Sequence, residues 1–161
     1  MRVVLLGTEG YHPTDRGHTA CVVVPEAGLV FDAGTALFRL GGYLETETLD
    51  IVLSHAHLDH IVGLTYLLGV LPDRDLRCVT VHARPVVLDA VRQHLFAPAL
   101  FPVEPDFAMR PLPRELAVGG GGRLRSFPLP GHPGGSVGFR VDWPGASLAY
   151  VTDVVADEQA D

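Results

Sequence analysis

The segment 55–60 holds three histidines and one aspartate, directly after a predicted strand. Side chains alternate along a strand with period two, so His55 and His57 leave the strand end on the same side. Asp59 follows two residues later, and His60 lies where the next predicted helix begins. Because imidazole and carboxylate groups are ligands of zinc and similar divalent cations, this spacing predicts a metal site.

A second interpretation treats the same segment as a polar loop in which histidines cluster by chance. Three imidazoles this close together cannot all be separate core residues. Their burial would require polar partners or a cation to offset the lost solvation. We therefore prefer the metal interpretation, which requires further ligands elsewhere in the chain.

Further candidate ligands follow other predicted strands. His132 lies in the glycine- and proline-rich segment 129–136, where a histidine taken alone is more often a surface residue. Beside the first two histidines, however, His132 becomes a stronger candidate for a third metal ligand. Asp32 and Asp153 each end an apolar strand, where a carboxylate is costly unless it is paired or bound to a cation. Taken alone, each is equally a helix cap or a turn residue.

The composition excludes several classes of protein. The formal net charge of −7 excludes a strongly basic surface, so we expect no stable binding of nucleic acid. Cys21 and Cys78 form no C-x-x-C pair, which predicts neither a disulfide framework nor a thiolate zinc site and indicates a cytoplasmic protein. No apolar run approaches the roughly 18 residues of a membrane helix, so we expect no membrane association.

Hydrophobic periodicity predicts many short elements and one domain over residues 1–161. Strands are predicted over 2–6, 19–24, 29–32, 50–54, 76–82, 123–129, 136–142 and 147–152. Helices are predicted over 35–41, 60–70 and 85–95. The segment 96–113 carries five prolines and is predicted to hold no regular element. Hairpin connections are predicted at 119–122 and 143–146.

Together these blocks resemble the metallo-β-lactamase superfamily of metallohydrolases. The run His55-Ala56-His57-Leu58-Asp59-His60 matches its H-x-H-x-D-H signature, and Asp32, His132 and Asp153 stand in the expected order. The stretches 6–8, 63–64 and 134–140 look like the ribonuclease Z and cyclic-nucleotide phosphodiesterase branch. The resemblance implies an α+β fold, an αββα sandwich of two mixed β-sheets with flanking helices.

The resemblance also implies the metal ligands. The first metal would be held by His55, His57 and His132, the second by Asp59 and His60, with Asp153 bridging both. Asp32 would orient ligand histidines through hydrogen bonds rather than bind metal. The expected cofactor is a divalent metal, Zn²⁺ with two ions per complete site, with Mn²⁺ or Fe²⁺ as alternatives.

The same resemblance implies a reaction. A hydroxide formed at the metals would attack a phosphorus or carbonyl centre, and Asp59 could orient that nucleophile as a catalytic residue. Candidate substrate-binding residues are Arg16, His18 and Ser136. For Arg16 and His18 the alternative roles are a solvated surface charge and a turn or packing residue.

This sequence departs from the family pattern in one respect. The pattern continues to a further histidine, well beyond the bridging aspartate, that completes the second metal site, whereas this sequence ends at Asp161. We therefore expect a chain truncated at its C-terminus, with fewer than two metals bound per chain. Truncation would leave an edge or apolar face uncovered, so we also expect self-association into a homo-oligomer.

Three functions remain open from the sequence. The leading prediction is a metal-dependent hydrolase of the phosphodiesterase type, acting on a small-molecule or phosphodiester substrate. Within the hydrolases, the alternative is an enzyme that cleaves a thioester, lactone or other carbonyl substrate. The alternative from a different class is a non-catalytic metal-binding fragment that lacks the last ligand histidine.

Overall fold

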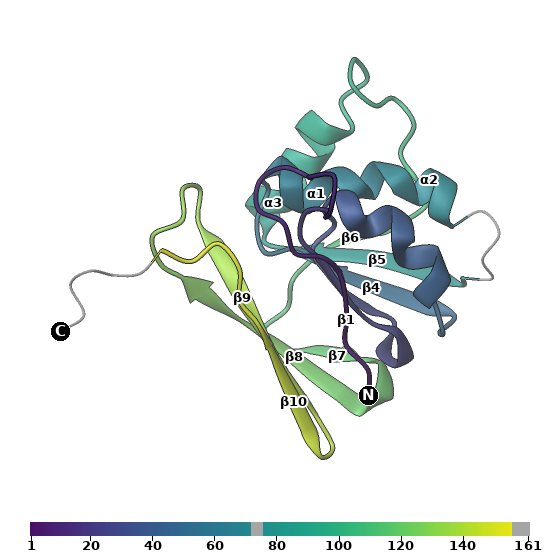
Figure 1. Ribbon diagram of the computed structural model, residues 1–161, viewed down its shortest axis with the longest axis vertical. Coiled ribbons are helices and arrows are strands. Elements are labelled where there is room, and N and C mark those ends of the chain that lie inside the picture. The colour runs from purple at the N-terminus through teal and green to yellow at the C-terminus, as the bar shows by residue number, and fades with distance from the viewer. Residues whose placement is uncertain (72–75, 156–161) are drawn as a thin grey trace.

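The computed structural model describes residues 1–71 and 76–155. Within these ranges the chain forms two β-sheets, with helices covering one face of the first sheet (Figure 1). None of the helices in the described part is long and apolar enough to cross a membrane. The chain end on which the prediction of truncation depends, 156–161, lies outside the described residues.

The first sheet has six strands. In their order across the sheet, they are β1 (Val4–Gly7), β2 (Cys21–Val24), β3 (Leu29–Phe31), β4 (Thr48–Val52), β5 (Cys78–Ala83) and β6 (Ala108–Pro111). The strands β1 to β3 pair antiparallel, and β3 to β6 pair parallel. The parallel strands share one carboxyl edge, so the residues that follow β3, β4 and β5 are brought close together.

The second sheet has four strands and is antiparallel throughout. Its strands are β7 (Leu116–Val118), β8 (Gly122–Leu129), β9 (Ser136–Trp143) and β10 (Ala146–Tyr150), in the order β10-β9-β8-β7. The predicted hairpin at 143–146 is confirmed, because Ala146 pairs with Trp143. A short 3₁₀ turn over Gly119–Gly121 makes the other predicted connection, and Gly120 adopts a φ of 71° that favours glycine.

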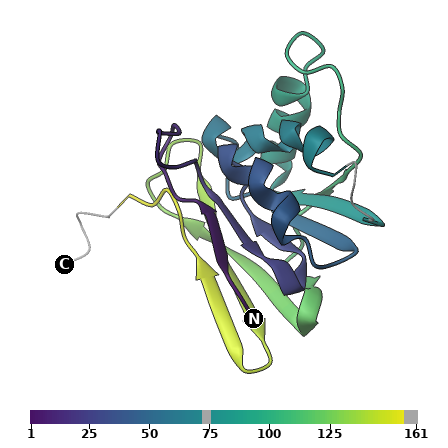
Figure 2. The same cartoon turned by 45° about the vertical axis from the view of Figure 1, so that its right-hand side comes forward.

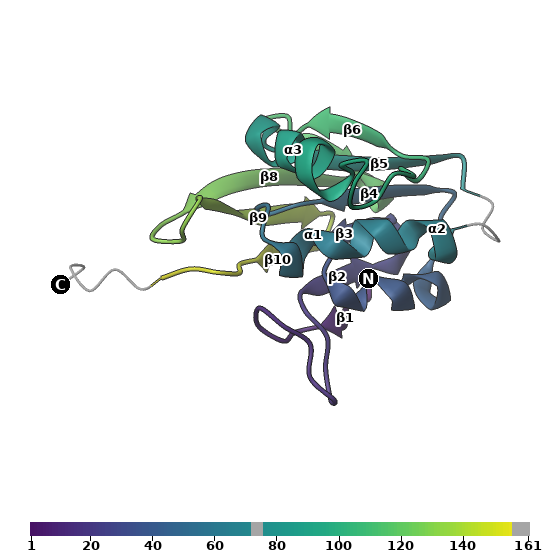
Figure 3. The ribbon, with the colours of Figure 1, turned by 90° about the horizontal axis from the view of Figure 1, so that it is seen from above.

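Three short α-helices lie on the first sheet, and Figure 3 looks onto this helical layer. They are α1 (Leu58–Ile61), α2 (Leu67–Val70) and α3 (Pro85–Ala90). The 3₁₀ segments are Pro25–Ala27, Thr35–Tyr43 and Val62–Tyr66, and a π-helical turn over Val91–Leu95 continues α3. Pro85 opens α3 at the first helical position, where its missing N–H costs nothing.

The core has two parts because the first sheet buries both of its faces. In β2, Cys21 and Val23 pack toward the helices, whereas Val22 and Val24 pack toward the second sheet. Figure 2 shows the resulting order of layers, helices, first sheet and second sheet. The α+β class and the pair of sheets are confirmed. Among the described residues, no helix covers the outer face of the second sheet, where arginines of β8 and β9 are exposed.

Two predicted elements differ from the structure. The predicted helix over 60–70 is three short pieces, α1, the 3₁₀ segment Val62–Tyr66 and α2. The prediction that 96–113 holds no regular element is wrong, because Ala108–Pro111 forms β6 beside β5. β6 is the last strand of the sheet, so Pro111 leaves no neighbouring strand without a donor.

Candidate metal centre

The candidate residues gather where strands end. Asp32 follows β3, and His55 and His57 follow β4, so the parallel pairing of these strands places them at one edge. His57 is the last extended residue before α1, and the helical turn then brings His60 back toward the strand ends. The second sheet supplies His132 from the connection between β8 and β9.

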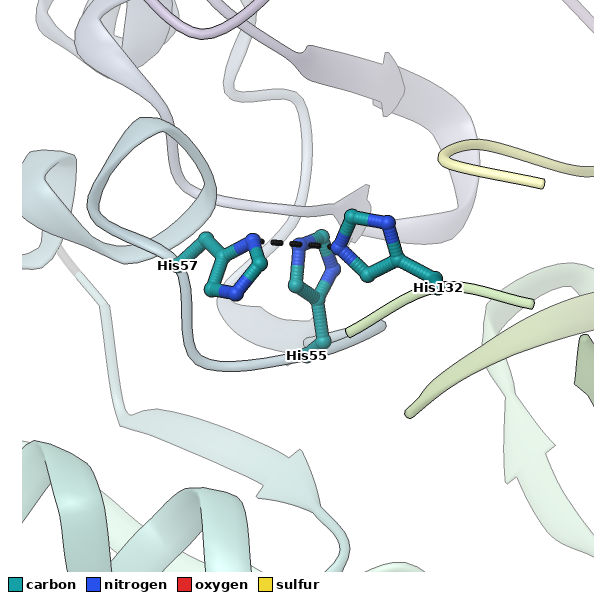
Figure 4. Close-up of side chains that lie close together, drawn as sticks. All are labelled: His55, His57 and His132. Atoms are coloured by element: carbon teal, nitrogen blue, oxygen red, sulfur yellow. Dashed lines mark hydrogen bonds between the residues drawn. The ribbon is translucent and has the colours of Figure 1, made fainter. Parts of the chain in front are cut away.

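His55, His57 and His132 form a compact group (Figure 4). One nitrogen from each ring lies within 4.8 Å of the others, and Nε2 of His132 is 3.0 Å from Nδ1 of His57. His55 is buried and His57 is exposed, so the group sits at the surface with one face open to solvent. Three imidazoles arranged in this way match the donor set of a zinc ion.

A second group shares His55 with the first. It contains His55, His60 and Asp153, with ligand atoms again within 4.8 Å of one another. Oδ2 of Asp153 lies 2.7 Å from Nε2 of His60 and 3.8 Å from Nε2 of His55, so this carboxylate stands between the two rings. Oδ2 of Asp59 lies 3.3 Å from Nε2 of His60, at the border of this group.

Asp32 is fully buried beneath both groups and accepts four hydrogen bonds. The Ser54 backbone N–H donates to Oδ1 at 2.7 Å. The Ser54 hydroxyl, the His60 Nδ1–H and the Tyr150 hydroxyl donate to Oδ2 at 2.7, 2.8 and 2.8 Å. Asp32 also holds a φ of 55°, an uncommon backbone conformation that aspartate tolerates better than most residues.

This network sets the protonation of His55. Since the Ser54 hydroxyl donates its proton to Asp32, its oxygen accepts from His55 Nδ1–H at 2.9 Å. The lone pair of His55 therefore lies on Nε2, which is buried and has no hydrogen-bond partner in the described part of the chain. Burial first, and then the charge of nearby His60, lowers the pKa of His55 to about 4. A neutral ring with an unsatisfied buried lone pair fits a metal ion.

Hydrogen bonding to Asp32 also fixes the orientation of the His60 ring. Burial alone would lower the pKa of His60, but the hydrogen bond and charge of Asp32, together with the charges of Asp153 and Asp59, outweigh burial and raise it. With Nδ1–H donated to Asp32, Nε2 faces the Asp153 carboxylate at 2.7 Å. Two acceptors at that distance require positive charge between them, which a proton or a metal cation supplies.

The side chains of the predicted substrate-binding residues form no hydrogen bond or ion pair with these groups in the described part. Arg16 is exposed on the loop after β1. The ring of His18 packs edge-on against Phe38, with ring centroids 4.9 Å apart. Ser136 is buried at the start of β9, and its hydroxyl lacks a partner within the described ranges. Their roles in binding substrate stay predictions.

Sequence reasoning missed two residues at this edge. Tyr150 lies in the strand predicted over 147–152, and its hydroxyl reaches Asp32 from the second sheet. Arg84 follows β5 and lines a cavity beside His55 and His57. The position of Arg84 just beyond the strand predicted over 76–82 is a signal that could have identified it.

Comparisons with known proteins identify the family of the chain. The family model described as the metallo-β-lactamase superfamily matches residues 13–159. A ribonuclease Z from Nitrosopumilus maritimus (strain SCM1) is 34% identical over 73 residues, which cover 42% of this chain and 24% of that protein.

Solved structures show the same fold. The metallo-β-lactamase fold protein YhfI from Bacillus subtilis aligns with a TM-score of 0.69 and 18% identity, over 91% of this chain and 60% of its own. Zn²⁺-bound PqqB from Methylobacterium extorquens aligns with a TM-score of 0.67 and 16% identity, over 92% of this chain and 64% of its own. The chain thus spans less than two thirds of the length of each of these proteins.

Proposed function

The chain belongs to the metallo-β-lactamase superfamily, and from this membership we propose that it is a metal-dependent hydrolase of a phosphodiester or other phosphate-ester substrate. The similarity to a ribonuclease Z, together with the stretches at 6–8, 63–64 and 134–140, favours a phosphodiester over a thioester or lactone. A hydrolase of a carbonyl substrate is the alternative that the assay below separates.

The observation that carries the proposal is the convergence of three imidazoles from distant parts of the chain. His132 comes from a different sheet and is 75 residues from His57, yet their ring nitrogens are 3.0 Å apart. His55 completes the group with a buried nitrogen that has no partner among the described atoms. Ordinary core packing gives no reason to bring three such nitrogens together.

We propose Zn²⁺ as the metal, a choice supported by nitrogen-rich ligands and by the zinc named for the PqqB structure. Mn²⁺ and Fe²⁺ are the alternatives. When bound, such a metal lowers the pKa of a water ligand toward about 7 and stabilises negative charge on substrate oxygens.

The remaining roles belong to the chain's own residues. His55, His57 and His132 would hold one metal, and His60, Asp59 and Asp153 would hold the second, with Asp153 between the two. Asp32 keeps the protons of His55 and His60 on Nδ1, so that both rings present Nε2 to the cations. Asp59, whose side chain remains partly accessible, would orient the attacking nucleophile.

Substitution of His57 tests the proposal. His57→Ala removes one of three ligands of the first group, and we expect it to lose bound zinc and hydrolysis of bis-p-nitrophenyl phosphate together. His94→Ala is the matched control, because His94 is an exposed histidine after α3, outside both groups. Zinc content is measured by atomic emission. In the wild type, chelation should abolish turnover, and added zinc or manganese should restore it.

The outcomes separate the alternatives. Turnover of a thioester or lactone panel without phosphodiester turnover would assign the carbonyl alternative. Zinc binding that depends on His57, with no turnover of any substrate, would assign a non-catalytic metal-binding role. Unchanged zinc content in His57→Ala would contradict the metal centre itself.

A further inference from the structure

A cavity of about 200 Å³ lies beside the candidate metal centre. His55 and His57 form one wall, the apolar side chains of Val86 and Val87 in α3 form another, and Pro133 belongs to the loop that carries His132. A ligand in this cavity would therefore touch the histidines directly. The mostly apolar wall also lowers the local dielectric and strengthens any charge interaction inside it.

One formally charged side chain, Arg84, lines this cavity. Arg84 lies between β5 and α3, and its Nη2 donates a hydrogen bond of 2.6 Å to the Gly135 carbonyl oxygen. Its Nε is buried and has no partner within the described ranges. Gly135 has a φ of 76°, a backbone conformation that favours glycine, and it holds its carbonyl oxygen against the guanidinium.

The charge of Arg84 is not balanced by a carboxylate of the described residues. No carboxylate within the described ranges forms an ion pair with it, and no acidic side chain lines the cavity. Other arginines of the chain do pair with carboxylates, namely Arg2, Arg77, Arg92, Arg123, Arg125 and Arg140. A guanidinium has five N–H donors, and leaving a partly buried one without an anion is costly. Arg84 therefore has both the charge and the hydrogen-bond donors to bind an anion.

We propose that Arg84 binds an oxyanion of the substrate, a phosphate or a carboxylate, that neighbours the group to be hydrolysed. Guanidinium groups hold such oxyanions through paired, charge-assisted hydrogen bonds. With this group against Arg84, the adjacent ester faces His55, His57 and the His132 loop. This inference rests on the proposed function, and it adds that the substrate carries a second negative group beside the scissile one.

Binding of inorganic phosphate tests the role of Arg84 without relying on turnover. Phosphate and acetate are titrated by calorimetry into wild type, Arg84→Met, Arg84→Lys and Arg92→Met, each treated with chelator and each loaded with zinc. Arg92 is the control because it is exposed beyond the end of α3, where it pairs with Asp89. We expect Arg84→Met to weaken phosphate binding at least about tenfold, the loss of one charge-assisted pair, and Arg92→Met to leave it unchanged.

Arg84→Lys keeps the charge but loses the planar pair of donors, so we expect intermediate binding; it also serves as the test if Arg84→Met does not fold. Tighter binding of phosphate than acetate assigns a phosphate as the natural group, and the reverse assigns a carboxylate. Equal phosphate affinity in wild type and both Arg84 variants, or no anion binding by wild type, would overturn the inference. Zinc content of the same samples reports separately on the metal centre. A failure of the proposed metal centre is therefore distinguishable from a failure of the role of Arg84.

Discussion

Asp32 controls the protonation of two histidines at once. It accepts a hydrogen bond from the Ser54 hydroxyl, whose oxygen in turn accepts one from His55, and it accepts a hydrogen bond from the Nδ1–H of His60 directly. Tyr150 adds a fourth donor from the second sheet. A fully buried carboxylate is stabilised by such a set of donors, and both imidazoles then present Nε2 toward the candidate metals.

Replacement of Asp32 by asparagine should therefore affect both stability and metal binding. An amide oxygen carries no charge. The amide NH₂ is a hydrogen-bond donor, so it cannot accept hydrogen bonds from the donors that surround residue 32. We expect Asp32→Asn to lower the free energy of unfolding by about 3 kcal/mol and the zinc affinity by about 10- to 100-fold. Urea unfolding and competition with a zinc chelator dye measure the two effects.

Two further variants serve as comparisons. Tyr150→Phe removes one donor from Asp32 and should cost about 1 to 2 kcal/mol, with a smaller loss of zinc affinity than Asp32→Asn. Asp89→Asn changes an exposed aspartate on α3 and should change little. If Asp32→Asn resembled Asp89→Asn in zinc affinity, Asp32 would have no part in orienting the histidines.

At the level of single residues, the sequence predicted the polar side chains that follow apolar strands. His55, His57 and His132 do lie together, as their positions after strands indicated. Tyr150 was missed because an aromatic residue in a strand is equally compatible with plain packing, and only the partner of its hydroxyl distinguishes the two. Such a partner lies 118 residues away in the sequence and leaves no local signal.

At the level of elements, the segment from α1 to α2 is held against the sheet by Gly63. The Gly63 N–H donates to the Ala33 carbonyl at 2.7 Å, and a Cβ at residue 63 would collide with the carbonyl oxygens of Gly34 and Ala33. This close approach keeps His60 above Asp32. It also explains why a glycine interrupts the apolar periodicity that predicted one continuous helix.

Alanine substitution in this segment gives a matched pair. Gly63→Ala should lower the free energy of unfolding by about 2 kcal/mol or more, because backbone atoms rather than flexible side chains must move. Gly69→Ala in α2 meets no atom within 4 Å and should be neutral or stabilising by up to about 1 kcal/mol. Thermal and urea unfolding measure both variants, and equal stability of the two would contradict the proposed contact.

The prediction for 96–113 was wrong because the effect of a proline on a strand depends on whether its nitrogen faces a partner strand. β6 pairs with β5 along one side only, and Pro111 stands opposite Ala83 at the end of that ladder. A missing donor is tolerated on an edge strand, whereas it would break a central one. The position of a strand within a sheet is set by contacts between distant segments, which the local sequence does not report.

At the level of the whole molecule, the candidate centre lies at the junction of the two sheets. His55 and His57 follow β4 of the first sheet, while His132 lies between β8 and β9 of the second and Asp153 follows β10. The sequence indicated these candidate ligands through a motif and their order, whereas the packing of one sheet on the other brings them together. An ion bound there would link the two sheets across the apolar core between them.

Zinc should therefore raise the melting temperature of the chain. The ligands converge only when the sheets are docked, so the metal binds the folded state in preference to the unfolded one. At about 100-fold excess over the dissociation constant the gain is about 2.7 kcal/mol, which for a chain of this size is about 5 to 10 °C. Circular dichroism melts of chelator-treated and zinc-loaded protein measure the shift.

His132→Ala removes the candidate ligand between β8 and β9 and should lose most of the shift, whereas His94→Ala should keep it. An equal shift in His132→Ala would mean that the stabilising metal binds without His132.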